Sequence, residues 1–334
     1  MIFSVNITNM KTKGRKIKIK NKKKNKSVRW KDEVCSPYSK GRAIAPKSCF
    51  TRGTILDLKG TYNKYNSDRP IHTNKPNEIR SIIQQRLPHC QKESCWVQNV
   101  AQPEIKNKLL SLLFAPPQPS EWKNNPKSWL SNFDILGVLK QYEQNFANFL
   151  FIGPSAIDYD YRKPDQGMRC VCPKLCEFDL QSVFKQGKRK IGVIFNLDKH
   201  YQGGSHWVSL FIDLEEKFIF YFDSTSDPIP KEIKRFIDKV RTQGLDMTPK
   251  FRFKYYENRQ MEHQMQNNEC GMYSLFFIIT MLMREKDGKK LDTKQTIGIF
   301  LGKRGRISDK QMNEMRDDYF NDSTDSTDSN DSTE

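Results

Sequence analysis

The longest apolar segment of this chain restricts its fold more than any other feature. Ser274 to Met283 contains almost only apolar side chains, and Arg284 ends the run. A membrane span needs about 20 such residues, so this segment is too short for one. The stretch from Gly271 to Arg284 is instead typical of a helix buried on all sides. The rest of the chain therefore has to supply a core around it.

The ends of the chain predict neither a membrane protein nor a secreted one. The apolar start, MIFSV, is too short for a signal peptide, and the positive charge follows it. The 334 residues allow one large domain with extensions, or two small domains. With 21 Phe, 12 Tyr and 5 Trp, the sequence is too aromatic to be disordered throughout.

The charge is concentrated at the two ends of the chain. Residues 1–120 carry +18, residues 121–300 carry +4 and residues 301–334 carry −4, which gives the net charge of +18. Ten of the sixteen residues from Lys11 to Lys26 are Lys or Arg. We expect residues 1–30 to form a solvated, disordered arm. Three interpretations stay open for it: an inert arm, a nuclear-targeting patch, or contact with DNA or RNA.

The opposite end is acidic. Residues 317–334 contain seven acidic side chains, no basic one, and a repeat of Ser, Thr and Asp. This low-complexity composition predicts a disordered tail.

The eight cysteines do not have the spacing of a disulfide framework. The group of Cys170, Cys172 and Cys176 could bind zinc, but it lacks the paired Cys-x-x-Cys halves of a structural site. The group of His89, Cys90 and Cys95 is a weaker candidate. We therefore expect reduced, mostly buried thiols and neither a metal nor another cofactor.

From about Trp122 onward, hydrophobic periodicity predicts an ordered domain. Helices are expected at 129–149, 230–243, 271–284 and 308–319, and strands at 190–196, 206–213, 218–222 and 250–256. The two strands at 206–213 and 218–222 form a predicted β-hairpin. We expect an α+β domain of ordinary size over 122–316. Residues 31–121, with helices near 77–86 and 105–114, form an N-terminal extension of unknown role.

Four residues of this domain fit one chemical mechanism. Cys270 stands at the start of the apolar helix, where the helix dipole favours a thiolate. His206 begins the first strand of the hairpin and Asp223 ends the second, so the hairpin brings them together. Asp223 can then orient the imidazole of a nucleophile–base pair. Gln264 can lend its amide to an oxyanion hole.

Each of these residues also has an ordinary structural interpretation. A single His on a strand is most often a core residue, an Asp followed by Ser-Thr-Ser is most often a turn former, and a Cys at a helix start is commonly inert. The order and context of the motifs Ser205–Trp207, Phe222–Ser224 and Gln264–Gly271 make the catalytic interpretation stronger. Together they resemble the ubiquitin-like-protein proteases, a superfamily that includes SUMO-specific proteases, adenovirus proteinase and polyprotein proteases of large DNA viruses. Upstream, Trp129–Ile135 resembles the opening Trp-Leu motif of that catalytic domain.

This resemblance covers residues 122–300 and implies a papain-like architecture, with a small, mostly antiparallel central sheet packed by helices. It implies His206 as the base, Asp223 as its orienting residue, Cys270 as the nucleophile and Gln264 in the oxyanion hole.

The resemblance also implies that Trp129 and Trp207 wall a narrow channel, although ordinary core packing is the alternative for both. Only Gly-Gly-like substrate backbones would thread such a channel. The sequence departs from the family at Glu269, where the family usually has Asp; this change is conservative and leaves the catalytic positions intact.

Three functional hypotheses follow. The first is a cysteine endopeptidase that cleaves after Gly-Gly-type sequences and processes viral proteins, because the Lys- and Asn-rich style resembles that of AT-rich giant DNA viruses. It would act on polyproteins or structural proteins in the virion or the host cytoplasm. The second is an isopeptidase that removes SUMO or ubiquitin from host proteins. The third is a nucleic-acid-binding virion protein with a vestigial protease fold, against which the intact quartet argues.

Overall fold

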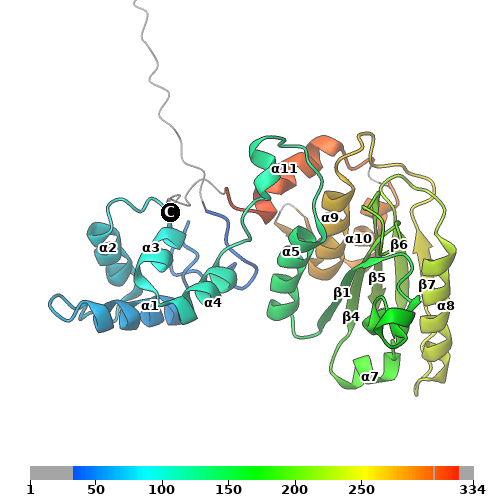
Figure 1. Cartoon of the computed structure of the whole chain (residues 1–334), viewed down its shortest axis with the longest axis horizontal. Coiled ribbons are helices and arrows are strands. Elements are labelled where there is room, and N and C mark those ends of the chain that lie inside the picture. Colours follow the sequence, from blue (N-terminus) through cyan, green and yellow to red (C-terminus); the bar gives the residue numbers. More distant parts are fainter. Residues whose placement is uncertain (1–32, 287, 304, 323–334) are drawn as a thin grey trace, which may run out of the picture. The chain divides into compact units, whose positions relative to one another are not determined.

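The computed structural model describes residues 33–286, 288–303 and 305–322 (Figure 1). The predicted basic arm and residues 323–334 of the predicted acidic tail lie outside these residues. Within the described part, no helix is both long and apolar enough to cross a membrane.

The first part of the described chain is a helical region, residues 33–117. Its helices are α1 (Arg52–Tyr65), α2 (Pro76–Arg86), α3 (Glu93–Val100) and α4 (Pro103–Leu113). Proline at the first position of α2 and α4 is compatible with a helix start because that amide has no intrahelical partner. Helices α2 and α4 confirm the predicted helices near 77–86 and 105–114, whereas α1 and α3 had not been predicted. Phe50, Ile83 and Trp96 belong to a hydrophobic core of this region's own.

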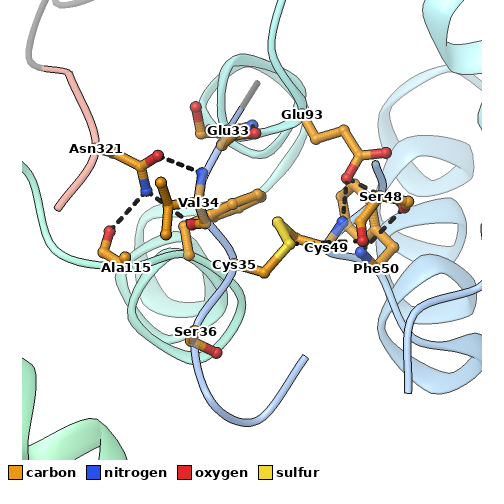
Figure 2. Close-up of a disulfide and its surroundings, with 12 residues drawn as sticks. Glu33, Val34, Cys35, Ser36, Ser48, Cys49, Phe50, Glu93, Ala115 and Asn321 are labelled. Atoms are coloured by element: carbon orange, nitrogen blue, oxygen red, sulfur yellow. Dashed lines mark hydrogen bonds between the residues drawn. A yellow bond between two sulfur atoms is a disulfide. The ribbon is translucent and has the colours of Figure 1, made fainter. Parts of the chain in front are cut away.

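The prediction of reduced thiols is wrong for six of the eight cysteines. The structure joins Cys35 to Cys49, Cys90 to Cys95 and Cys170 to Cys176, and leaves Cys172 and Cys270 as thiols. Figure 2 shows the first of these disulfides, in which Cys35 directly follows Val34. The pairing escaped prediction because it depends on which backbones meet in space, and cysteine spacing alone does not give that.

The second part is a five-stranded mixed sheet with helices on both faces, which confirms the α+β class (Figure 1). In spatial order the strands are β1 (Phe149–Ala156), β4 (Lys190–Asn196), β5 (Trp207–Asp213), β6 (Phe218–Phe222) and β7 (Lys254–Glu257). The three central strands are antiparallel, as expected, but both edge strands pair in parallel.

Two hydrophobic cores cover the two faces of this sheet. One contains residues of α5 (Asn132–Asn145), α9 (Cys270–Met283), α10 (Thr293–Phe300) and α11 (Asp309–Tyr319). The other contains residues of α7 (Leu180–Lys185) and α8 (Lys231–Asp246). The shorter elements are η1 (Ser120–Lys123), β2 (Arg162–Lys163), η2 (Pro164–Gln166), β3 (Arg169–Cys170), α6 (Pro173–Cys176), β8 (Glu285–Lys286) and β9 (Lys289–Lys290).

Helix α9 is the apolar helix predicted from the sequence. Every residue from Cys270 to Leu282 is buried, so the helix runs through the protein interior between the sheet and its neighbouring helices. Helix α5 begins at Asn132 rather than at Trp129, because Ser131 and Asp134 form a capping box that fixes its start. It ends at Asn145, and Phe149 begins β1 instead of closing the helix.

The predicted boundary of the acidic tail at residue 317 is wrong for residues 317–322. Helix α11 continues to Tyr319, which is buried. The Asn321 side chain then accepts a hydrogen bond from the Val34 amide and donates to the carbonyls of Val34 and Ala115 (Figure 2). These contacts, over as many as 287 residues of sequence, tie this part of the tail to the folded chain.

Candidate active site

The hairpin of β5 and β6 brings His206 and Asp223 together. Ser209 of β5 lies opposite Phe222 of β6, so the residue before β5 and the residue after β6 lie at the same end of the ladder. The His206 Nε2 atom is 2.7 Å from Asp223 Oδ1. Asp223 is 1% exposed, whereas the His206 side chain is 17% exposed. A buried carboxylate thus holds the imidazole, and the ring remains accessible to solvent.

Asp223 is itself fixed by its neighbours. Its Oδ1 atom accepts hydrogen bonds from the Thr225 amide and hydroxyl at 3.0 and 2.8 Å. The Asn258 side chain accepts from the Asp223 amide at 3.0 Å and donates to its carbonyl at 2.6 Å. The sequence analysis did not single out Asn258, because nothing in the local sequence links a residue just after β7 to the end of β6.

Cys270 is the first residue of α9 and is 1% exposed. It lies within hydrogen-bonding reach of His206. Burial by itself would lower the pKa of His206, but the hydrogen bonds and negative charges of Asp223 and Cys270 outweigh it and raise the pKa to about 10. The arrangement therefore favours a charged imidazolium beside Cys270.

Gln264 is held next to the same end of the hairpin. Its backbone amide donates to the Ser224 carbonyl, and its Oε1 atom accepts from the Ser224 hydroxyl at 2.7 Å. One N–H of its side-chain amide donates to the Gln266 carbonyl. Because an amide nitrogen has two hydrogens, the second can serve another acceptor. Ser224, the residue that follows Asp223, thus links Gln264 to the end of the β5–β6 hairpin.

Trp129 and Trp207 line one groove of about 530 Å³. Trp129 is 45% exposed, whereas Trp207 is 8% exposed and donates its indole N–H to the Leu130 carbonyl at 3.1 Å. Trp129 is therefore an open wall of the groove and Trp207 a packed one. Gly203 and Gly204 also line the groove, just before His206.

The cysteine groups considered for zinc are both altered by disulfides. Ligand atoms of His89, Cys90 and Cys95 lie within 4.8 Å of one another, but Cys90 and Cys95 are bonded to each other. Cys170 and Cys176 are likewise paired. Metal ligation by cysteine requires thiolates, so neither group fits a metal in this state.

Comparison with known proteins identifies the domain. Residues 181–329 match the model of the Ulp1 protease family, C-terminal catalytic domain. A protein of Acanthamoeba polyphaga mimivirus named "putative thiol protease" is 28% identical over 276 residues, which cover 75% of this chain and 85% of that protein. A cysteine protease of African swine fever virus is 25% identical over 239 residues, covering 64% of this chain and 81% of that protein.

The fold agrees with these matches. The crystal structure of the African swine fever virus protease superposes with a TM-score of 0.58 at 21% sequence identity, covering 87% of this chain and 97% of that one. The chain carries the catalytic domain of a Ulp1-family protease and is a cysteine peptidase. The expected family and the expected enzyme class are thus confirmed.

Proposed function

We propose that this chain cleaves peptide bonds after Gly-Gly-type sequences, with Cys270 as nucleophile, His206 as acid and base, and Asp223 as the residue that orients His206. The observation that carries this proposal is the 2.7 Å contact of His206 Nε2 with Asp223 Oδ1, next to a thiol at a helix start. In this geometry the second imidazole nitrogen is directed to the thiol.

The proposed reaction has two steps. His206 takes the proton of the Cys270 thiol as the sulfur attacks the scissile carbonyl carbon, and the carbonyl electron pair moves to oxygen. The Cys270 backbone N–H and the free N–H of the Gln264 amide stabilise this oxyanion. The oxyanion collapses to a thioester as His206 protonates the leaving amine. Water, deprotonated by His206, then attacks the thioester, releases the acid product and returns the thiol–imidazole pair.

The preference for Gly-Gly rests on the groove that Trp129 and Trp207 line. We expect a substrate backbone bound beside these two indole rings to have little room for side chains, so glycine is the residue that fits. We propose viral polyproteins or structural proteins as substrates, in the virion or the host cytoplasm. The viral thiol and cysteine proteases to which the chain is similar support this choice.

A second candidate function is the removal of SUMO or ubiquitin from host proteins. It is favoured by relatives from African swine fever virus, 26% identical to this chain, that are named SUMO-1 cysteine proteases. It needs the same four residues and differs only in substrate. The third hypothesis, a nucleic-acid-binding virion protein, rests only on the charge of residues 11–26, and the cysteine peptidase assignment argues against a vestigial fold. DNA or RNA contact by that arm stays a prediction.

One experiment separates the substrate hypotheses. The purified full chain and its Cys270→Ala variant are incubated in parallel with viral structural proteins, SUMO conjugates and ubiquitin conjugates. Cleavage of the viral proteins alone after Gly-Gly, absent with the variant, supports the first function. Release of SUMO or ubiquitin with the viral proteins left intact would replace it with the second.

A further inference from the structure

Next to the predicted nucleophile lies a buried ion pair that the proposed chemistry does not use. Glu269 directly precedes Cys270 and is fully buried, and Arg316 of α11 is 5% exposed. The Arg316 Nη2 and Nε atoms donate to Glu269 Oε2 at 3.0 and 3.2 Å. The two residues are 47 positions apart, so the C-terminal helix reaches back to the first turn of α9.

The remaining donors of Arg316 point to another segment. Its Nη1 atom donates to the Pro126 carbonyl at 2.8 Å and to the Ser128 carbonyl at 3.3 Å. The guanidinium also lies over the Trp122 ring, 4.2 Å from the ring centroid. Trp122 in turn donates its indole N–H to the Ser128 carbonyl at 3.0 Å. Arg316 thus fixes the backbone that leads directly into Trp129.

The two segments that Arg316 contacts also pack against each other near the groove. A Cβ atom added to Gly271 would lie 3.1 Å from Leu130 Cβ, so the turn after Cys270 is in close contact with the residue after Trp129. The Leu130 carbonyl accepts from the Trp207 indole. Arg316, the start of α9 and both walls of the groove therefore form one connected set of contacts.

A buried ion pair is costly, which makes its presence here informative. Burial raises the pKa of Glu269, and the charge and hydrogen bonds of Arg316 act against this rise. Within the described residues the Glu269 Oε1 atom has no hydrogen-bond partner. Apolar side chains at such positions often give equal or greater stability, so the pair is poorly explained by stability alone. The geometry of the Glu269–Arg316 pair explains its presence, because one planar guanidinium can donate to several acceptors at once.

We propose that Arg316 is a positioning residue that holds Cys270 and the Trp129 wall of the groove in one fixed relation. This inference rests on the roles proposed above for Cys270 and Trp129. It assigns to the C-terminal helix a part in the reaction, although no residue of that helix touches the reacting atoms.

The test compares Arg316→Gln with wild type in the full chain. One probe is iodoacetamide, which needs only a reactive Cys270 thiolate. The other is a peptide amide ending in Gly-Gly with a fluorogenic leaving group, which also has to pass the groove. Arg316→Gln should lower kcat/KM by about 10²-fold, since small displacements of reacting groups cost that much. We expect both a lower kcat and a higher KM, and slower alkylation of Cys270.

Arg284 provides the matched control. It caps the other end of α9 and forms an ion pair with the buried Asp213, with Nη2 2.7 Å from Oδ2. Arg284→Gln therefore removes an ion pair with a buried carboxylate from the same helix, far along it from Cys270, although Arg284 is 22% exposed and Arg316 only 5%. It should lower the thermal midpoint while leaving kcat, KM and the alkylation rate unchanged.

The double variant Glu269→Gln/Arg316→Gln separates the effect of an unpaired buried charge from the loss of positioning by Arg316. It also replaces the single variant if Arg316→Gln does not fold. It leaves no unpaired buried charge but still lacks the bonds to Pro126 and Ser128. Recovered thermal stability with a KM that stays high supports the proposal. Wild-type kinetics in the double variant, or in Arg316→Gln, would overturn it, as would an equal kinetic loss in Arg284→Gln. If Cys270→Ala retains activity, the proposed function fails instead.

Discussion

Two buried carboxylates near Cys270 differ from the buried carboxylate of the helical region. In the helical region both oxygens of Glu93 are occupied: Arg80 Nε donates to one at 2.7 Å, and the Cys49 amide and Ser48 hydroxyl donate to the other (Figure 2). In the catalytic domain, Asp223 and Glu269 each keep one buried oxygen that has no partner among the described residues. Buried groups of this kind are uncommon in native structures.

The two regions also differ in what holds them together. The helical region has a small core and two disulfides, one linking Cys35 to Cys49 and one linking Cys90 to Cys95. Small regions bury too little apolar surface for stability and commonly rely on such links. In the catalytic domain, two hydrophobic cores cover the two faces of the sheet, and α9 belongs to one of them. We therefore expect substitutions in the helical region to change stability, and those at the end of the β5–β6 hairpin to change catalysis.

The largest effect is expected for Cys270→Ala, which should abolish peptide cleavage and leave the circular dichroism spectrum unchanged, because the sulfur forms the covalent intermediate. Cys172 is an internal control, since it is the other thiol not paired in the structure. Iodoacetamide should label Cys270 faster than Cys172 at neutral pH. Equal rates would contradict an activated thiolate.

Asp223→Asn should lower kcat by up to about 10⁴-fold, less than the loss of Cys270, because Asp223 orients the imidazole without touching substrate. It should also change the pH profile. The pKa of His206 is raised to about 10, so the imidazolium and its stabilising effect are lost as the pH rises through that value. Without the Asp223 charge this pKa falls, and the alkaline limb of kcat/KM should move to lower pH. An alkaline limb at the wild-type pH would show that Asp223 does not raise the pKa of His206.

Gln264→Ala should lower kcat by about 10²-fold with little change in KM, the usual cost of one oxyanion donor. Gln264→Glu is a useful companion, because it keeps the size of the side chain and the acceptor for Ser224 but places a negative charge beside the oxyanion. A change in KM alone would make Gln264 a substrate-binding residue.

In the helical region, Cys35→Ser/Cys49→Ser should lower the free energy of unfolding by about 3 kcal/mol, as expected for opening a loop of this length. Denaturant unfolding measures this loss. The values of kcat and KM below the unfolding transition should stay at wild-type levels. A kinetic loss as large as that of Gln264→Ala would erase the distinction between the two regions.

The smallest effect on catalysis is expected from deleting residues 1–30, since the catalytic segment 121–300 carries only +4. Hydrolysis of a Gly-Gly peptide should be unchanged. Affinity for duplex DNA and its salt dependence should fall, because the deleted residues carry +11 of the net charge of +18. If the full chain and the chain without residues 1–30 bind DNA equally at two salt concentrations, the arm does not bind DNA.

Much of the catalytic domain could be predicted because its signals are local. The apolar run of α9 and the close spacing of β5 and β6 follow directly from residue patterns, and the motifs around His206, Asp223 and Cys270 suggested the family. Strand β1 was missed because Gly153 and Pro154 interrupt its pattern. Its register shifts between Ile152 and Ser155, and its place at the sheet edge tolerates the proline.

The sequence by itself indicated several elements of the catalytic domain, such as α8, α9, β5 and β6, because helix and strand periodicities act over a few neighbouring residues. Its local motifs also indicated the four residues of the proposed chemistry. Only the tertiary structure decided which distant groups meet: Cys35 with Cys49, Asn258 with Asp223, and Arg316 with Glu269. Such pairs form when folding brings separate segments together and burial makes an unpaired polar group costly. The residues adjacent in sequence to either partner indicate neither condition.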